Sequence, residues 1–212
     1  MSVIDAKIPP MGESAEDLYR RALEAADAEG RLPVPPLSEW ETFPFEGEIR
    51  TRPLHPPGDE PARAGEDPSD CWRCRHGDGE AIWSDERWYV TPLEKPSGLP
   101  VLVILQPREH CDLGDLPPHL AAELGPLIVR VERAVDAVGE IGRVHVGRWG
   151  DGSAHLHWWF IARPARLPQL RTSFAAIWDD ILPPVPEEIW RENLAVVART
   201  LAAGGGTDHL RA

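Results

Sequence analysis

GSAHLHWWFIARP, at residues 152–164, decides the fold. Its apolar residues predict a β-strand over residues 154–162. Because side chains two positions apart on a strand share a face, His155 and His157 should point the same way, with Leu156 behind them in the core. Two adjacent imidazoles are costly to leave without partners, which favours a binding or catalytic site. The alternative is a solvated sheet face with two ordinary histidines.

A second short motif, Cys71-Trp72-Arg73-Cys74, lies upstream. Two thiolates at this spacing supply half of a tetrahedral metal site. A redox pair would begin a helix after a strand, whereas this pair follows a Pro-rich segment and precedes the loop HGDGE at residues 76–80. Metal binding is therefore favoured over a redox role or two unconnected cysteines. The candidates for the remaining ligands are His76, His110, His119, His145, His155 and His157.

The segments around these motifs predict an α+β fold. Further strands are expected at residues 81–83, 87–91, 101–105 and 142–149, and helices at residues 14–29, 116–138, 167–180 and 186–201. This order favours an antiparallel β-sheet with packed helices. The expected organisation is an N-terminal helix with a Pro-rich acidic arm (1–68), a compact domain (69–203) and a flexible C-terminal tail (204–212).

Composition and charge exclude several classes of protein. The formal net charge is −13 and no basic stripe is visible, so we expect no binding of long nucleic acid. No apolar run approaches the roughly 18 residues that a membrane-spanning helix needs. Residues 1–10, MSVIDAKIPP, lack the basic and apolar regions of a signal peptide. Three cysteines are too few for a disulfide framework, so a cytoplasmic protein is expected.

The order of these motifs resembles the histidine-triad (HIT) superfamily over about residues 70–165. The matching pieces are CWRC at 71–74, VLVILQPREH at 101–110, the helix at 116–138 and HLHWWFIARP at 155–164. In zinc-carrying members of this family, both cysteines, the Pro-x-x-His histidine and the first histidine of the triad hold the metal. The resemblance therefore implies a HIT-like fold with a structural zinc, bound here by Cys71, Cys74, His110 and His155.

The resemblance also implies a chemistry. The family's nucleophile is the middle histidine, here His157, which attacks the α-phosphorus of a nucleotide ester, phosphoramidate or polyphosphate to form a nucleotidyl-histidine. The attacking nitrogen must be unprotonated, so the other ring nitrogen needs an acceptor, usually a backbone carbonyl. Gly152 and Ser153 could hold the phosphate through N–H groups and a hydroxyl, unless residues 150–152 are a plain hairpin turn. The implied protein is a homodimeric nucleotide hydrolase or nucleotidyltransferase.

Two positions depart from the family pattern. The third histidine of the triad is Trp159, which we expect beside the substrate but which cannot deliver a proton to a leaving group. The family's asparagine on the preceding strand is also missing, since Asn193 is the only asparagine in the chain. Both losses bear on catalytic rate more than on fold or metal. The alternative function is therefore a catalytically weak or inactive zinc-stabilised nucleotide-binding protein, with a redox protein last.

Overall fold

A computed structural model describes residues 12–211 of the chain. These residues divide into two compact units, with the boundary between Pro61 and Ala62. The sequence predicts boundaries after residues 68 and 203, and that three-part organisation stays a prediction. The expectation that residues 1–10 form no signal peptide falls outside the described range.

The first unit carries one long helical element among its described residues, α1 (Ala15–Glu24), followed by a 3-10 turn at Pro36–Glu39. Ser14 begins α1, because its hydroxyl accepts a hydrogen bond from the Asp17 amide at 3.1 Å. The helix ends earlier than the expected residue 29. The Asp27 carboxylate accepts hydrogen bonds from the amides of Glu29 and Arg31, at 3.0 and 2.8 Å, and this loop conformation competes with a further helical turn.

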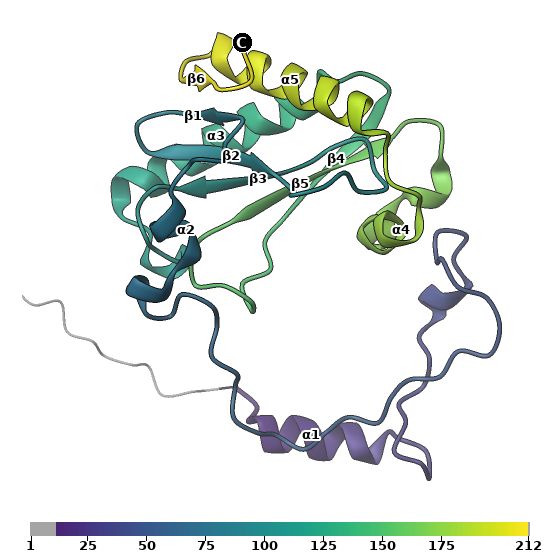
Figure 1. The fold of residues 1–212 in the computed structure, drawn as a ribbon. Helices are drawn as coiled ribbons and strands as arrows, with labels where there is room; N and C mark the ends of the chain where they lie inside the picture. Colours follow the sequence, from purple (N-terminus) through teal and green to yellow (C-terminus); the bar gives the residue numbers. More distant parts are fainter. Residues whose placement is uncertain (1–11, 212) are drawn as a thin grey trace, which may run out of the picture. The chain divides into compact units, whose positions relative to one another are not determined.

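The second unit is built on an antiparallel sheet, and this confirms the predicted α+β class (Figure 1). Its strands are β1 (Trp83–Ser84), β2 (Trp88–Pro92), β3 (Leu102–Pro107), β4 (Ile141–Gly147), β5 (Trp158–Pro164) and β6 (Thr207–Asp208). In the described part of the chain they lie in the order β4-β5-β3-β2-β1-β6. We expected a flexible tail at 204–212, whereas the strand β6 within it pairs with β1.

Four α-helices accompany this sheet in the described second unit: α2 (Trp72–His76), α3 (Pro118–Asp136), α4 (Ala175–Ile181) and α5 (Glu187–Ala203). The helix expected at 167–180 is instead two 3-10 turns, Pro168–Leu170 and Thr172–Phe174, followed by α4. Thr172 has a φ of 68°, in the left-handed region, so the backbone cannot continue as one right-handed helix through it. Two further 3-10 turns, Pro68–Asp70 and Leu113–Asp115, flank the metal motifs.

Side chains alternate between the two faces of β5, so this strand contributes to two separate hydrophobic cores. Trp158 and Phe160 face the large core under α3 and α5, whereas Trp159 and Ile161 face a smaller core under α4. The backbone of α4 comes very close to the loop before β3. A Cβ atom on Gly98 would lie 2.5 Å from the Asp179 carbonyl oxygen, so this approach requires glycine.

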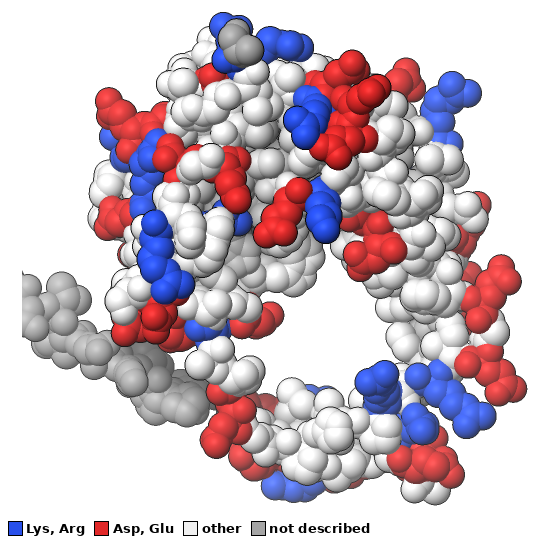
Figure 2. Space-filling model, viewed as in Figure 1, with Lys and Arg blue, Asp and Glu red and all other residues white. Residues whose placement is uncertain are grey.

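Charged side chains of both signs are mixed on one face of the molecule (Figure 2). On the face drawn in Figure 2, Lys and Arg lie among Asp and Glu and do not gather into a stripe. Among the described residues, no helix has the length and apolar character needed to cross a bilayer.

Candidate metal centre and neighbouring histidine

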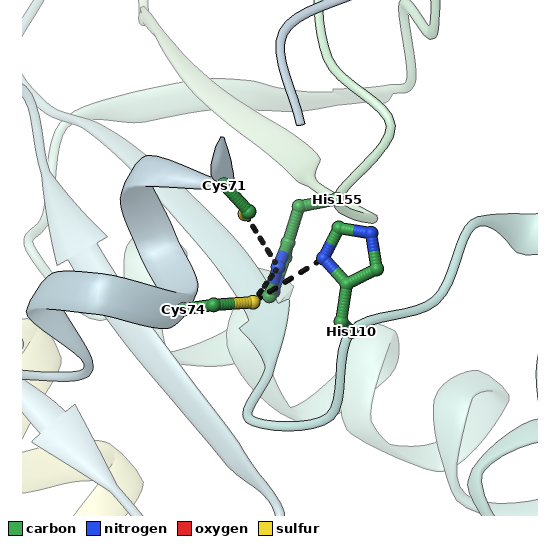
Figure 3. A group of neighbouring side chains, drawn as sticks. All are labelled: Cys71, Cys74, His110 and His155. Atoms are coloured by element: carbon green, nitrogen blue, oxygen red, sulfur yellow. Dashed lines mark hydrogen bonds between the residues drawn. The ribbon is translucent and has the colours of Figure 1, made fainter. Parts of the chain in front are cut away.

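Two cysteines and two histidines converge at one end of the sheet (Figure 3). Cys71 caps the N-terminus of α2 and Cys74 lies one turn along the same short helix. His110 follows β3, and His155 lies in the segment that enters β5. The four potential ligand atoms lie within 4.8 Å of one another. The sequence missed the five-residue helix α2, which follows a 3-10 turn and not the strand that a thioredoxin-like redox pair would need.

Three of the distances between ligand atoms in this cluster are close to those around a tetrahedral ion. The Nδ1 atom of His155 lies 3.5 Å from the Cys71 sulfur and 3.6 Å from the Cys74 sulfur. The His110 Nδ1 atom lies 3.2 Å from the Cys74 sulfur. Zinc bonds of about 2.3 Å to sulfur and 2.0 Å to nitrogen place two tetrahedral ligands about 3.6 Å apart. The donor set and its spacing therefore suit zinc.

The environment of His155 fixes which nitrogen faces the cluster. Its side chain is buried, and its Nε2–H donates to the carbonyl oxygen of Pro107 at 2.8 Å. A carbonyl can only accept, so Nδ1 keeps its lone pair toward the two cysteines. Burial also lowers the pKa of His155, which favours the neutral imidazole that a metal needs. A hydrogen bond of this kind typically orients a metal-bound histidine.

The thiols must lose protons before they bind a metal. Burial and the neighbouring Cys71 raise the pKa of the Cys74 thiol to about 11 when no metal is bound. Metal binding therefore releases a proton from Cys74, and affinity rises with pH. The third cysteine, Cys111, is buried next to the cluster but is not one of the four clustered residues.

His157 differs from the sequence prediction in its backbone. Strand β5 begins at Trp158, so neither His155 nor His157 lies on a regular strand. The Leu156 amide donates to the carbonyl of Cys111 at 2.8 Å, and the His155 amide reaches the Ser153 hydroxyl at 3.3 Å. These bonds lie outside the strand ladder, so residues 154–157 form an irregular segment that leads into β5.

The half-buried His157 ring has the hydrogen bond that a nucleophile needs. Its Nδ1–H donates to the backbone carbonyl of His155 at 2.8 Å. The neutral ring then carries its lone pair on Nε2, away from that carbonyl. The ring centroid lies 6.5 Å from that of Trp159, in an edge-on arrangement.

The two residues expected to bind phosphate lie in a loop between β4 and β5. Two backbone hydrogen bonds from Ala64 hold this loop in place. The Ala64 amide donates to the Gly152 carbonyl and the Ala64 carbonyl accepts from the Ala154 amide, both at 3.0 Å. Ala64 and Ser153 thus form a parallel bridge. The segment is therefore not a plain hairpin turn, because it also pairs with Ala64. The Ala154 amide already has a backbone partner.

Sequence reasoning missed an ion cluster that secures the same loop. The Asp112 carboxylate accepts hydrogen bonds from Arg63, at 2.6 Å, and from Arg148. Arg63 also donates to the carbonyl of Gly150 at 3.2 Å. Arg148 is therefore an ion-paired arginine. Nothing in the local pattern links Arg63 to residues that lie far along the chain.

Trp159 faces away from the main core and stands beside a second tryptophan. Its ring centroid lies 6.4 Å from that of Trp149, with 78° between the planes. The two side chains line a hollow of about 340 Å³ that continues under α4. Trp149 is 55% exposed, and its position could not be inferred because it depends on the path of the loop.

Comparisons with known proteins give matches at the level of structure only. No protein-family model matches the chain, and no curated protein is detectably similar to it. A Zn-bound histidine triad family protein from Mycobacterium smegmatis is 23% identical, with a TM-score of 0.46, over 64% of this chain and 98% of that one. A histidine triad nucleotide-binding protein from Sulfolobus tokodaii is 17% identical, with a TM-score of 0.45, over 63% of this chain and 93% of that one.

A uridylyltransferase is also similar in structure, at 18% identity and a TM-score of 0.43, over 63% of this chain and 45% of that one. Histidine-triad proteins, the family suggested by the motif order, therefore recur among the structures that this chain resembles.

Proposed function

We propose that this chain is a histidine-triad-type nucleotide hydrolase or nucleotidyltransferase that acts at an α-phosphate through His157. One observation carries the proposal. The Nδ1–H of His157 is held by the carbonyl of His155, so the neutral imidazole presents the Nε2 lone pair. The adjacent His155 belongs to the metal cluster, which leaves one histidine for binding metal and the other for attack.

The reaction has two steps. The Nε2 lone pair of His157 attacks the α-phosphorus, and the bond to the leaving group breaks with its electron pair going to that group. Water or another acceptor then attacks the same phosphorus and loses a proton to solvent, and the phosphorus–nitrogen bond breaks to return the lone pair to Nε2. Gly152 and Ser153 hold the phosphate through the loop backbone and hydroxyl. Trp159 contacts the substrate and offers one N–H donor but no transferable proton.

Zinc bound by Cys71, Cys74, His110 and His155 is structural in this proposal. It ties α2 to the residues that follow β3 and precede β5, and it contributes folding energy that the small helix α2 cannot supply alone. The His155 carbonyl, which orients His157, is thereby held in place. The partners are a nucleotide or nucleotide conjugate and a second copy of the chain, in the cytoplasm. We propose no membrane partner and no long nucleic acid partner. The net charge of −13 disfavours binding to the negatively charged backbone of nucleic acid.

The proposal is tested by trapping the covalent intermediate. The zinc-loaded protein is mixed with an adenosine phosphoramidate or a dinucleoside polyphosphate, quenched, and analysed by mass spectrometry of its peptides. We expect a nucleotidyl adduct on His157, and none in the His157→Ala variant. His119→Ala is the matched control, since this exposed histidine lies on α3 outside the cluster and should leave the adduct unchanged.

A binding protein without catalysis is the second candidate, and Trp159 is the observation that favours it. An adduct absent from wild type and from a Trp159→His variant, with nucleotide binding retained in both, would establish this alternative.

A further inference from the structure

A groove runs beside Trp159, between the outer face of β4 and β5 and the helix α4. It consists of two adjoining hollows of about 340 and 180 Å³. Trp149, Ile161 and Ala176 line both hollows, so the two are continuous. Their combined size is in the range of pockets that hold small organic ligands.

The larger hollow has aromatic and aliphatic walls. Trp149 and Trp159 meet edge to face, and Leu93 and Leu102 complete the apolar lining. Two indole rings on one exposed groove form a surface on which a planar ring can stack. Every nucleobase has a π-face, and stacking on aromatic side chains is the usual way that proteins hold bases.

The charges around the groove indicate which part of a nucleotide it suits. Asp179 and Asp180 lie in the lining, and no Lys or Arg lines either hollow within the described chain. The Asp179 carboxylate accepts a hydrogen bond from the Leu99 amide at 2.7 Å, which holds α4 against the loop before β3. Two carboxylates repel a phosphate but accept hydrogen bonds from ring amines and sugar hydroxyls. The groove therefore suits the base and sugar.

His145 supplies a polar end to the smaller hollow. It lies on β4 directly opposite Ile161, and its Nε2 atom is buried with no hydrogen-bond partner among the described residues. A buried ring nitrogen without a partner is costly, and a ligand that meets it recovers that cost. Burial, and then the nearby Arg163, lower the pKa of His145, so its ring is neutral and can meet a donor or an acceptor.

The groove and His157 share Trp159 as a common wall. The centroid of the Trp159 ring lies 6.5 Å from that of His157 and 6.4 Å from that of Trp149, so Trp159 contacts both the histidine and the groove. In a nucleoside 5′-phosphate, one sugar separates the phosphorus from the base. A single substrate can therefore place its phosphorus at His157 and its base in the groove.

We propose that this groove binds the nucleobase of the substrate, with Trp149 and Trp159 as its aromatic walls and His145 at its polar end. This inference rests on the proposed function, because it assigns the other end of the same substrate. It gives Trp159 a role in holding the base, and it makes Trp149 and His145 residues that determine which base is accepted.

The test measures binding of the two halves of a nucleotide to the zinc-loaded full chain by calorimetry. The probes are adenosine, guanosine, cytidine and uridine for the base, and ribose 5-phosphate for the other half. Trp149→Ala should weaken binding of the preferred nucleoside about tenfold or more, while Trp149→Phe, which keeps a stacking ring, should stay within a few-fold. Ribose 5-phosphate should bind all variants alike. Leu167→Ala, which removes a side chain of 51% exposure that lines neither hollow, is the control and should bind like wild type.

His145→Leu separates base recognition from stacking, because it keeps an apolar surface and removes the ring nitrogen. It should reduce the preference for one nucleoside over the others, whereas Trp149→Ala should weaken all four nucleosides. Equal nucleoside affinity in wild type and Trp149→Ala would overturn the assignment, as would the absence of nucleoside binding in wild type.

The nucleotidyl adduct on His157 is measured in a separate experiment, so that the groove and the proposed chemistry are tested independently. An adduct with Trp149-independent nucleoside binding overturns the groove assignment and leaves the proposed function standing. Nucleoside binding that requires Trp149, without any adduct, supports the groove and removes the proposed chemistry.

Discussion

The Nε2–H of His155 is 2.8 Å from the carbonyl oxygen of Pro107, the last residue of β3. This bond turns Nδ1 of the ring toward Cys71 and Cys74, so the end of a central strand orients this candidate metal ligand. His110 lies three residues beyond the same proline and joins the cluster from the other side. The Pro-x-x-His motif thus contributes twice to one site, through a ligand and through the carbonyl that orients a second ligand.

The first prediction concerns the metal itself. Cys74→Ala should abolish binding of one zinc per chain and lower the free energy of unfolding by several kcal/mol, because loss of a structural metal couples directly to folding. Metal content by elemental analysis and a thermal melt would measure both effects. Cys111→Ala is the matched control, since it removes a neighbouring buried thiol outside the cluster, and its zinc content should be unchanged. A wild-type protein that binds no zinc would contradict the prediction.

The two neighbouring histidines should fail in different ways. His155→Ala removes a buried ligand and should lose zinc and stability. His157→Ala removes a half-buried ring outside the cluster, so its zinc content and melting temperature should stay close to wild type while turnover disappears. Thermal unfolding and metal content, measured side by side for the two variants, test this difference. If His157→Ala also lost its zinc, the division of roles would be wrong.

Trp159 predicts how the rate depends on the leaving group. With no proton donor at this position, wild type should favour good leaving groups, and the help that is missing is typically worth ~10²–10⁴-fold. Trp159→His should raise the rate for a poorly leaving alkyl amine relative to a nitrophenolate. Because the substitution also removes a groove wall, KM should rise, so the comparison is made on kcat for the two substrates. An unchanged ratio would exclude a proton-donating role for residue 159.

The residues just before the cysteines contact the loop that carries Gly152 and Ser153. A chain starting near Asp67 tests how much these contacts stabilise the protein. Such a chain lacks both backbone bonds of Ala64 and the ion pair from Arg63 to Asp112. We expect it to be less stable than a chain beginning at Ala62, with the two backbone hydrogen bonds contributing about 1 kcal/mol each. Denaturant unfolding of the two chains would measure the difference, and equal midpoints would show that the bridge to Ser153 is unimportant.

His145 predicts a dependence of stability on pH. Its pKa is lowered in the folded protein by burial and by Arg163, whereas the unfolded chain binds a proton near the ordinary value of about 6.5. The unfolded state therefore binds more protons as pH falls below that value, and stability decreases toward the folded pKa. His145→Leu should lose less stability than wild type between pH 7.5 and about 5. Unfolding curves at several pH values test this, and identical slopes would contradict it.

Local patterns supplied the cysteine pair and six candidate histidines, and the family resemblance narrowed the histidines to His110 and His155. The structure brings these two beside Cys71 and Cys74, but the backbone that presents them was not predicted. Cys71, Cys74, His110 and His155 each carry a metal-binding side chain within a recognisable short motif. The apolar alternation after residue 154 also predicted a strand, but its start was placed too early. The Leu156 amide pairs with Cys111 instead of continuing the regular ladder, and no local signal encodes that partner.

The groove could not be predicted from the sequence, because it depends on contacts between distant segments. His145 is one of six candidate histidines in the sequence, and no local signal shows which face of the sheet it occupies. Its setting depends on α4, and α4 docks through the close approach of Gly98 to Asp179. Contacts between segments about 80 residues apart produce no hydrophobic periodicity in either segment, so the sequence pattern does not reveal them.

The short strand β6 has a consequence for solubility. It pairs with β1, and around it the His209 amide donates to the Ile82 carbonyl at 3.0 Å while the Trp83 indole donates to the Gly205 carbonyl at 3.0 Å. Without residues 205–209, β1 would present an open backbone edge beside a large apolar ring. Such an edge is a template for pairing with other chains, so these few residues protect the protein from self-association into aggregates.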